Sequence, residues 1–148
     1  MIEYIWHENT NVEGLSPVTQ VYGVCFDEMG RILLLRQKGH GWNIPGGTPE
    51  AGETPSETLI REVYEETTVR IGAHELIGYQ EVVGDKGSPY YQLRYAAIVE
   101  RVDSQQPDPD KGETHERLFI APEDAMTYIT YPQYRGIFEA AIKWYRKK

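Results

Sequence analysis

Three glutamates, Glu62, Glu65 and Glu66, stand within five residues of one another, a short distance after the pair Gly46-Gly47. Like charges three or four residues apart on a helix destabilise it by about 0.2–0.5 kcal/mol per pair. This placement therefore indicates either a solvated acidic face or a site for a cation. Carboxylate oxygens suit hard cations, Mg²⁺ above all when phosphate completes the shell. Since glycines let the backbone approach a ligand closely, the neighbouring pair favours the cation site.

The start of the helix that carries these glutamates is specified by three residues. Thr54 suits the N-cap, Pro55 suits the first helical position, and Glu57 completes a capping box. These signals predict a helix over residues 55–67. At 100° per residue, the three glutamates fall within about 100° of arc on one face. The core-facing side is predicted to carry Ile60, Val63, Tyr64 and Thr67.

The spacing of these residues resembles the signature of the Nudix (MutT-like) hydrolase family. That signature has glycine, five residues, glutamate, seven residues, and then Arg-Glu-apolar-x-Glu-Glu-x-Gly-apolar. Here the same positions hold Gly47, Glu53 and the run from Arg61 to Val69, which gives a Nudix box over residues 47–69. The one departure is Thr68, where the family has glycine. Because threonine does not readily adopt a left-handed helix cap, we expect a changed helix exit there. Residues 30–47 and 112–125 are also similar to family segments.

The resemblance implies a fold, an activity and a set of roles. The fold would be of the α+β class, an α/β/α sandwich whose mixed β-sheet is flanked by helices, with the box as a loop-helix-loop. The activity would be metal-dependent hydrolysis of a nucleoside diphosphate linked to another moiety. Mg²⁺ or Mn²⁺ would be bound by Glu62, Glu65, Glu66 and the Gly46 carbonyl. Arg61 and Glu53 would form the pair that supports these carboxylates.

Hydrolysis of a pyrophosphate also requires a base and contacts to the substrate. Glu62 is a candidate base as well as a ligand, and a later-loop acid, Glu113 or Glu116, is the alternative. Candidate substrate contacts are basic side chains that meet phosphates, aromatic or imidazole rings in loops, and the glycine turn itself: Arg36, Lys38, Arg94, His40, Trp42 and Gly47. Solvated loop residues or core aromatics are the alternative for each of these.

Elements that must position the site are predicted on both sides of the central helix. Residues 18–26 and 31–36 are predicted strands around a hairpin turn, and residues 75–84 and 90–100 are a second pair around a turn at 85–89. A polar surface loop over 103–113 precedes a strand at 117–120, a short helix after residue 122 and an amphipathic helix over 133–146. Strand pairs interrupted by helices favour a mixed sheet with helices on its faces.

The whole chain limits the remaining possibilities. Its 148 residues fit one domain, residues 1–148, and a net charge of −8 argues against a binder of polymeric nucleic acid. The single cysteine, Cys25, excludes an intrachain disulfide and is predicted to be a buried core thiol. We expect neither a signal peptide nor a membrane span, and hence a cytoplasmic location.

Two questions stay open at this level. One is whether the protein is an active hydrolase or a non-catalytic Nudix-like module that binds a nucleotide as a sensor. The presence of every acidic position of the box favours the enzyme, acting on a small nucleotide-type diphosphate. The other question is which derivative is the substrate, because no secondary substrate signature is evident. A homodimer is also left open, since dimers are common in the family.

Overall fold

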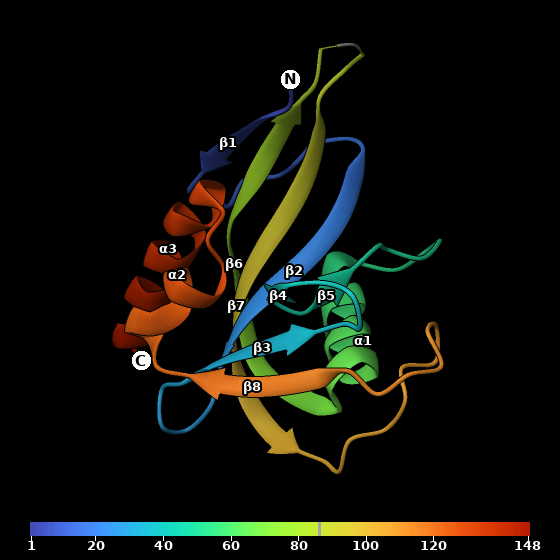
Figure 1. Ribbon diagram of the computed structural model, residues 1–148. Helices are drawn as coiled ribbons and strands as arrows, with labels where there is room; N and C mark the ends of the chain where they lie inside the picture. Colours follow the sequence, from blue (N-terminus) through green and yellow to red (C-terminus); the bar gives the residue numbers. More distant parts are fainter. Residues whose placement is uncertain (86) are drawn as a thin grey trace.

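The computed structural model describes residues 1–85 and 87–148 and contains a mixed β-sheet (Figure 1). The described strands are β1 (Glu3–His7), β2 (Val18–Phe26), β3 (Ile32–Arg36), β4 (Trp42–Asn43), β5 (Gly46–Gly47), β6 (Val69–Val83), β7 (Tyr90–Val102) and β8 (Glu116–Ile120). The strand order is β1-β6-β7-β2-β3-β4, with β5 paired to β2 and β8 paired to β3. The β2–β7 pair is parallel and the other described pairs are antiparallel. The sheet is therefore mixed, as predicted.

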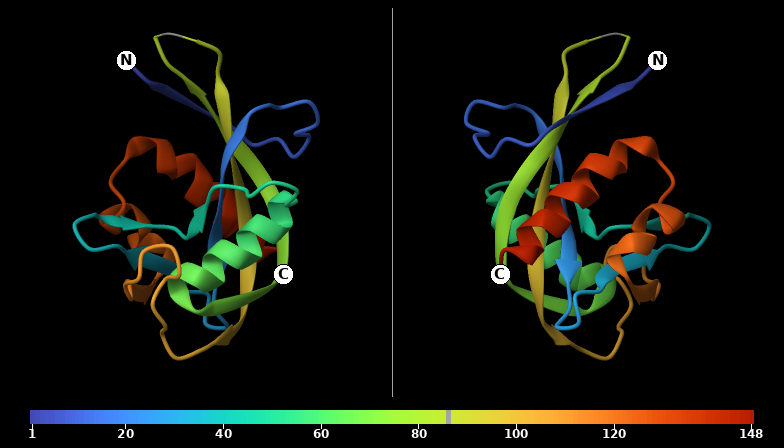
Figure 2. Two further views of the ribbon diagram at one scale, coloured as in Figure 1. Left: turned by 90° about the vertical axis from the view of Figure 1, so that its right-hand side faces the viewer. Right: turned by 90° about the vertical axis from the view of Figure 1, so that its left-hand side faces the viewer.

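The helices lie on opposite faces of this sheet (Figure 2). They are α1 (Pro55–Thr67), α2 (Ala125–Tyr128) and α3 (Arg135–Arg146), with short 3₁₀ turns η1 (Pro122–Asp124) and η2 (Pro132–Tyr134) before α2 and α3. Successive side chains of a strand point to opposite faces, and β2 shows the result. Val24 and Phe26 enter the core under α2 and α3, whereas Val21 and Cys25 enter the core under α1. The predicted sandwich and the buried thiol of Cys25 are both confirmed.

Several predicted boundaries shift in the structure. Strand β6 begins at Val69, directly after α1, instead of at residue 75, because it pairs along its length with β7. The segment after residue 121 forms η1 and α2 instead of one helix, and the terminal helix starts with η2. Strands β1, β4 and β5 were not predicted. The predicted turn over residues 85–89 includes residue 86, which lies outside the described residues.

Helix α1 has the predicted bounds but a different buried face. Its capping box is present: Thr54 Oγ1 accepts from the Glu57 backbone N–H, and Glu57 accepts from the Thr54 backbone N–H at 2.8 Å. The buried residues of α1 are Thr58, Leu59, Glu62, Val63 and Thr67. The prediction that Tyr64 is a core residue is therefore wrong, whereas Ile60 is only partly buried but packs against the core under α1. The reason is that α1 packs on the sheet along Leu59, where Gly23 of β2 leaves room for the leucine side chain.

The exit of α1 also differs from expectation. Thr68 takes the left-handed conformation, with φ 57° and ψ 34°, so the helix ends as a glycine would end it. This conformation is costly for a β-branched residue. Three hydrogen bonds stabilise it: Thr68 N–H donates to Tyr64 O at 2.8 Å, Thr68 O accepts from Asp103 N at 3.0 Å, and Thr68 Oγ1 accepts from Gln106 N at 3.1 Å. The predicted change of helix exit is therefore wrong.

No helix in the described part of the chain combines the length and apolar character needed to cross a bilayer.

Candidate active site

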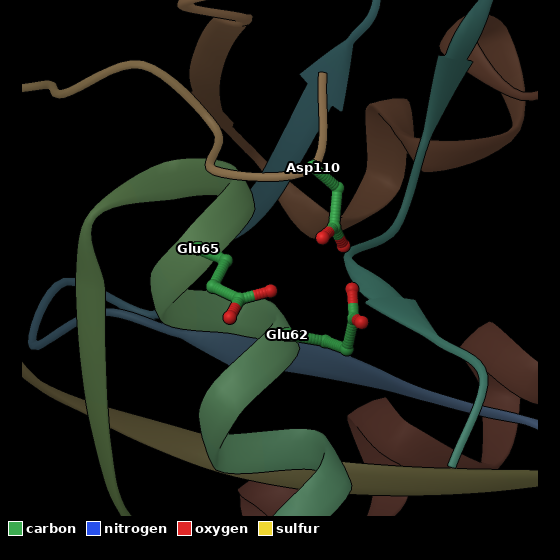
Figure 3. A group of neighbouring side chains, drawn as sticks. All are labelled: Glu62, Glu65 and Asp110. Atoms are coloured by element: carbon green, nitrogen blue, oxygen red, sulfur yellow. The ribbon is translucent and has the colours of Figure 1, made fainter. Parts of the chain in front are cut away.

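The three glutamates of α1 divide between two environments. Glu62 and Glu65 point toward Asp110, which projects from the loop between β7 and β8 (Figure 3). One carboxylate oxygen of each residue lies within 4.8 Å of the other two. Glu66 instead turns toward the glycine pair, where its Oε1 accepts from Gly46 N at 2.9 Å. The structure thus adds a loop carboxylate that was not predicted and places Glu66 apart from this cluster.

The donor set of this cluster fits a hard divalent cation. All three side chains offer only carboxylate oxygens, and oxygen ligands suit Mg²⁺ and Mn²⁺. Burial is the largest cause that raises the pKa of Glu62 and of Glu65, and Asp110 raises both further by charge repulsion. A bound cation would reverse this repulsion, because it favours the ionised carboxylates.

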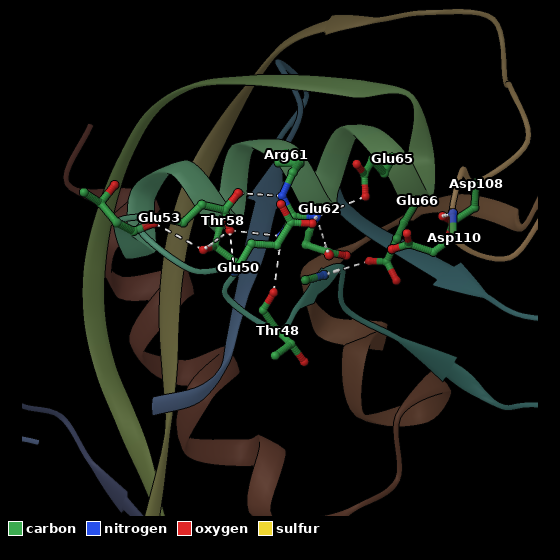
Figure 4. Close-up of polar contacts among 12 residues, drawn as sticks. Thr48, Glu50, Glu53, Thr58, Arg61, Glu62, Glu65, Glu66, Asp108 and Asp110 are labelled. Atoms are coloured by element: carbon green, nitrogen blue, oxygen red, sulfur yellow. Dashed lines mark hydrogen bonds and ion pairs between the residues drawn. The ribbon is translucent and has the colours of Figure 1, made fainter. Parts of the chain in front are cut away.

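Arg61 connects these acids to the loop that precedes α1 (Figure 4). Its Nε donates to Glu53 Oε2 at 2.6 Å and its Nη2 donates to Glu53 Oε1 at 3.0 Å. Its Nη1 donates to Glu62 at 2.8 Å and to Glu65 at 3.1 Å. The Arg61 hydrogen bond is the largest cause that lowers the pKa of Glu53, to about 2. The guanidinium therefore orients two cluster carboxylates while Glu53 holds the guanidinium.

The Gly46-Gly47 pair occupies a space that no side chain fits. A Cβ on Gly47 would lie 2.3 Å from Glu62 Cδ, and a Cβ on Gly46, which has φ +156°, would lie 2.4 Å from Val21 O and from the Tyr22 Cα. The two glycines therefore pass between strand β2 and the glutamates of α1. Gly46 donates its N–H to Glu66, and a role for its carbonyl stays a prediction.

Glu66 is a carboxyl group with an unusual proton affinity. Its pKa is raised to about 8, chiefly by burial and next by the charges of Glu62 and Asp108, although the Gly46 N–H opposes the shift. Gln37 Nε2 lies 3.4 Å from its Oε2. Glu66 also lines a cavity of about 210 Å³ with Gln37, His40 and Tyr22, so its carboxyl group is adjacent to open space.

The structure brings some predicted substrate contacts together and not others. His40 lines the cavity beside Glu66. Arg36 donates to both oxygens of Glu116, at 2.8 and 3.0 Å, and its guanidinium lies 4.6 Å from the Trp42 ring centroid. Arg36 of β3 thus contacts both Glu116 of β8 and Trp42 of β4. Two further predicted residues, Lys38 and Glu113, are exposed in loops.

Arg94 lies in a second polar cavity, of about 330 Å³, which shares Tyr22 and Asn43 with the first. Its side chain is almost fully buried, and its guanidinium carbon lies 4.9 Å from the Tyr22 ring centroid. Its described hydrogen-bond partners are neutral oxygens, those of Gln20, Gln92 and Leu93. Burial lowers the pKa of Arg94. The two cavities together form a concave polar surface that begins beside Glu66.

Asp110 is the residue that sequence reasoning missed. The polar residues and prolines of segment 103–113 predict a surface loop and do not indicate which of its acids enters the site. The segment Asp108-Pro109-Asp110 carries no spacing relation to the box, so its distance from Glu62 and Glu65 depends on the fold alone. The acidic side chain that this loop contributes to the cluster is that of Asp110, and the role of Glu113 or Glu116 as an alternative base stays a prediction.

Comparison with known proteins agrees with this geometry. A family model described as the NUDIX domain matches residues 17–141. The chain belongs to the Nudix family.

Two curated relatives match part of the chain. A MutT-like protein of Streptomyces ambofaciens is 37% identical over 87 residues, which cover 57% of this chain and 56% of the relative. The putative 8-oxo-dGTP diphosphatase YtkD of Bacillus subtilis is 33% identical over 76 residues, which cover 51% of this chain and 48% of the relative. The chain thus matches about half the length of these relatives.

Solved structures share the fold. The Bacillus subtilis pyrophosphohydrolase BsRppH superposes with a TM-score of 0.76 at 21% identity, over 96% of this chain and 90% of that chain. A C. elegans Ap4A hydrolase superposes with a TM-score of 0.66 at 22% identity, over 89% of this chain and 100% of that chain. At such identities the likeness establishes the fold alone.

Proposed function

We propose that this protein is a divalent-metal-dependent pyrophosphohydrolase that acts on a nucleoside diphosphate linked to another moiety. One observation supports this proposal above the others: Glu62, Glu65 and Asp110 converge from a helix and a loop, and Arg61 orients two of them. Mg²⁺ or Mn²⁺ bound there would neutralise charge on the bridging phosphates and activate a water molecule. Membership of the Nudix family is consistent with this activity.

The protein's own groups supply binding and proton transfer. Arg61 and Glu53 hold the carboxylates of the cluster in place. Glu66 is better suited than Glu62 to accept the proton of the attacking water, because Glu62 accepts a hydrogen bond from Arg61, whereas Glu66 bonds to Gly46 N and lines the smaller cavity. Its pKa of about 8 without metal would keep this carboxyl group mostly protonated at neutral pH, and a neighbouring divalent cation would lower the pKa and favour the ionised form that a base requires.

The non-reacting part of the substrate would extend along the two cavities. The smaller cavity begins at Glu66 and the larger one ends at Arg94, and Tyr22 borders both. A buried guanidinium held by neutral oxygens is electrostatically costly, so a ligand rich in hydrogen-bond acceptors would stabilise it. We therefore assign the nucleotide moiety to this surface.

A substrate panel tests the activity. The panel contains nucleoside triphosphates including 8-oxo-dGTP, dinucleoside polyphosphates, nucleotide sugars and ADP-ribose, each with Mg²⁺, with Mn²⁺ and with a chelator, and products are separated by chromatography. The names of two proteins described above, the putative 8-oxo-dGTP diphosphatase YtkD and the C. elegans Ap4A hydrolase, motivate the first two classes. We expect cleavage of a phosphoanhydride bond that requires metal.

Two variants make the panel specific for the proposed site. Glu65→Gln should lower kcat by about 100-fold or more, because it removes one charged oxygen ligand. Glu139→Gln, which makes the same change at an exposed position of α3, should retain the wild-type kcat. Metal-independent binding of nucleotides without turnover would instead support a sensor module.

A further inference from the structure

The loop that carries Asp110 is organised around a buried hydrogen bond between two side chains, those of Asp108 and His115. His115 Nε2 lies 2.8 Å from Asp108 Oδ2, and their side chains are only 1% and 4% exposed. A polar side-chain pair so fully withdrawn from water is unusual in a loop whose other residues from Asp103 to Thr114 are mostly exposed. Neither residue belongs to the Nudix box or to the carboxylate cluster.

Asp108 holds the loop through four of its atoms. Its Oδ1 accepts from Asp110 N at 2.9 Å, while Oδ2 contacts His115. Its backbone N–H donates to Glu113 O at 2.7 Å, and its backbone O accepts from Gly112 N at 2.7 Å. The carboxylate of Asp108 therefore bonds directly to the backbone of Asp110, the residue whose side chain enters the cluster.

His115 connects this loop to the sheet. It stands one residue before β8 (Glu116–Ile120), which pairs with β3 through five residues. Its backbone O accepts from Gln105 Nε2 at 2.7 Å, which ties the two ends of the loop together. Because β8 is fixed in the sheet, the hydrogen bond of the His115 imidazole fixes the position of Asp108, and Asp108 in turn fixes the backbone of Asp110.

We propose that His115 is a positioning residue for divalent-metal binding, acting through Asp108 to hold Asp110 beside Glu62 and Glu65. The proposal rests on the proposed function only in assuming that the cluster binds a divalent cation. Partners outside the ligand shell that orient metal ligands typically contribute about 10–100-fold to metal affinity. A loop without the Asp108–His115 pair would still fold back between β7 and β8, but the Asp110 carboxylate would sample a wider range of positions.

The test measures Mn²⁺ affinity directly, from the electron paramagnetic resonance signal of the free ion, without any substrate. His115→Phe removes the contact to Asp108 while keeping a ring of similar size, and we expect it to weaken Mn²⁺ binding about tenfold or more. His115→Gln places an amide nitrogen where Nε2 lies, and we expect it to restore most of the affinity. A merely structural role would not distinguish the two in this way.

A double-mutant cycle decides whether the effect passes through Asp110. Asp110→Asn alone should weaken Mn²⁺ binding, and Asp110→Asn combined with His115→Phe should bind no more weakly than Asp110→Asn alone, because the positioned carboxylate is already gone. Additive losses would overturn the proposal, as would wild-type affinity in His115→Phe or an absence of specific Mn²⁺ binding in the wild type. If His115→Phe does not fold, His115→Asn, with a shorter amide, takes its place in the same cycle.

The outcome is separable from that of the proposed function. A protein that shows this pattern of Mn²⁺ affinities but hydrolyses nothing in the substrate panel would refute the hydrolase and leave the positioning role intact. A protein that hydrolyses a substrate with metal but shows equal Mn²⁺ affinity in wild type and His115→Phe would refute the positioning role of His115 and leave the hydrolase intact.

Discussion

Replacing Arg61 by methionine tests how much the Arg61 guanidinium stabilises the folded protein through its hydrogen bonds to the acidic side chains. Arg61 donates two hydrogen bonds to Glu53 and one each to Glu62 and Glu65, with distances from 2.6 to 3.1 Å. Methionine keeps an unbranched side chain but removes the charge and every donor. The carboxylates of Glu53, Glu62 and Glu65 would then lose the positive charge of the guanidinium that they share.

The expected cost follows from burial. Removing one partner of a buried ion pair costs about 3–5 kcal/mol. The side chains of Arg61 and Glu53 are 20% and 16% exposed, so water screens part of the loss. Because both side chains are only partly buried, we expect the free energy of unfolding to fall by about 2 kcal/mol, below that range. For a chain of this size the melting temperature should then drop by about 4–8 °C.

An exposed arginine provides the matched control. Arg101 also makes two bonds to one carboxylate, that of Asp103, at 2.7 and 3.0 Å, but its side chain is 56% exposed. Because water screens exposed ion pairs, Arg101→Met should leave the stability close to that of the wild type. Both variants are to be unfolded by urea and by heat at pH 7.5 in the presence of a chelator, followed by circular dichroism.

Two further results bear on the reasoning. Adding Glu53→Gln to Arg61→Met should recover part of the lost stability, because it removes one of the uncompensated charges. Equal losses in Arg61→Met and Arg101→Met would refute the view that Arg61 compensates buried charge. The network would then be a set of surface contacts of little energetic consequence.

Three other predictions concern the same helix. Millimolar Mg²⁺ or Mn²⁺ should raise the melting temperature of the wild type, by the equivalent of about 2.7 kcal/mol at a hundredfold excess over Kd. The Glu62→Gln/Glu65→Gln variant should lose most of this rise, and NaCl at matched ionic strength should not reproduce it in the wild type. In the presence of a chelator, the free energy of unfolding should fall as pH rises from about 4.5 to 8, because Glu66 ionises near 4.5 in the unfolded chain and near 8 in the folded one. Urea titrations at pH 5.5 and 8 should show a smaller fall in Glu66→Gln than in the wild type. An equal fall in the two proteins would contradict the shifted pKa. Thr68→Gly should be more stable than Thr68→Ala by about 1 kcal/mol. Both variants lose the hydrogen bond from Gln106 N, but only alanine is strained by the left-handed backbone conformation at this position. The reverse order of stability in thermal melts would argue against that strain.

The sequence predicts local features of this site well. The bounds of α1 follow from Thr54, Pro55 and Glu57, whose hydrogen bonds are local and so can be inferred from spacing alone. The hairpin of β2 and β3 and the mixed sheet also follow from hydrophobic runs and turn residues. The contact of Arg61 with Glu53 lies within nine residues and agrees with what the family resemblance implies.

Features that depend on tertiary contacts were not predictable in this way. The buried face of α1 is rotated toward Leu59 because Gly23 on a distant strand leaves space there. Asp110 reaches Glu62 across a loop between two strands, and no local pattern marks it. The two-residue strand β5 forms because Gly46 fits against Tyr22, which is again a contact between separate segments.

The anchoring of Thr68 has a consequence for local unfolding. Two backbone amides of the β7–β8 loop, those of Asp103 and Gln106, donate to Thr68, and Arg117 of β8 donates to Thr67 O at 2.7 Å. Unwinding the last turn of α1 would therefore release the loop at the same time. In native-state hydrogen exchange we expect the amides of Thr68, Asp103 and Gln106 to open as one cooperative unit. A divalent cation bound between α1 and the β7–β8 loop would slow the exchange of all three amides together. The exchange rates at the end of α1 and in the loop would then give the same opening free energy.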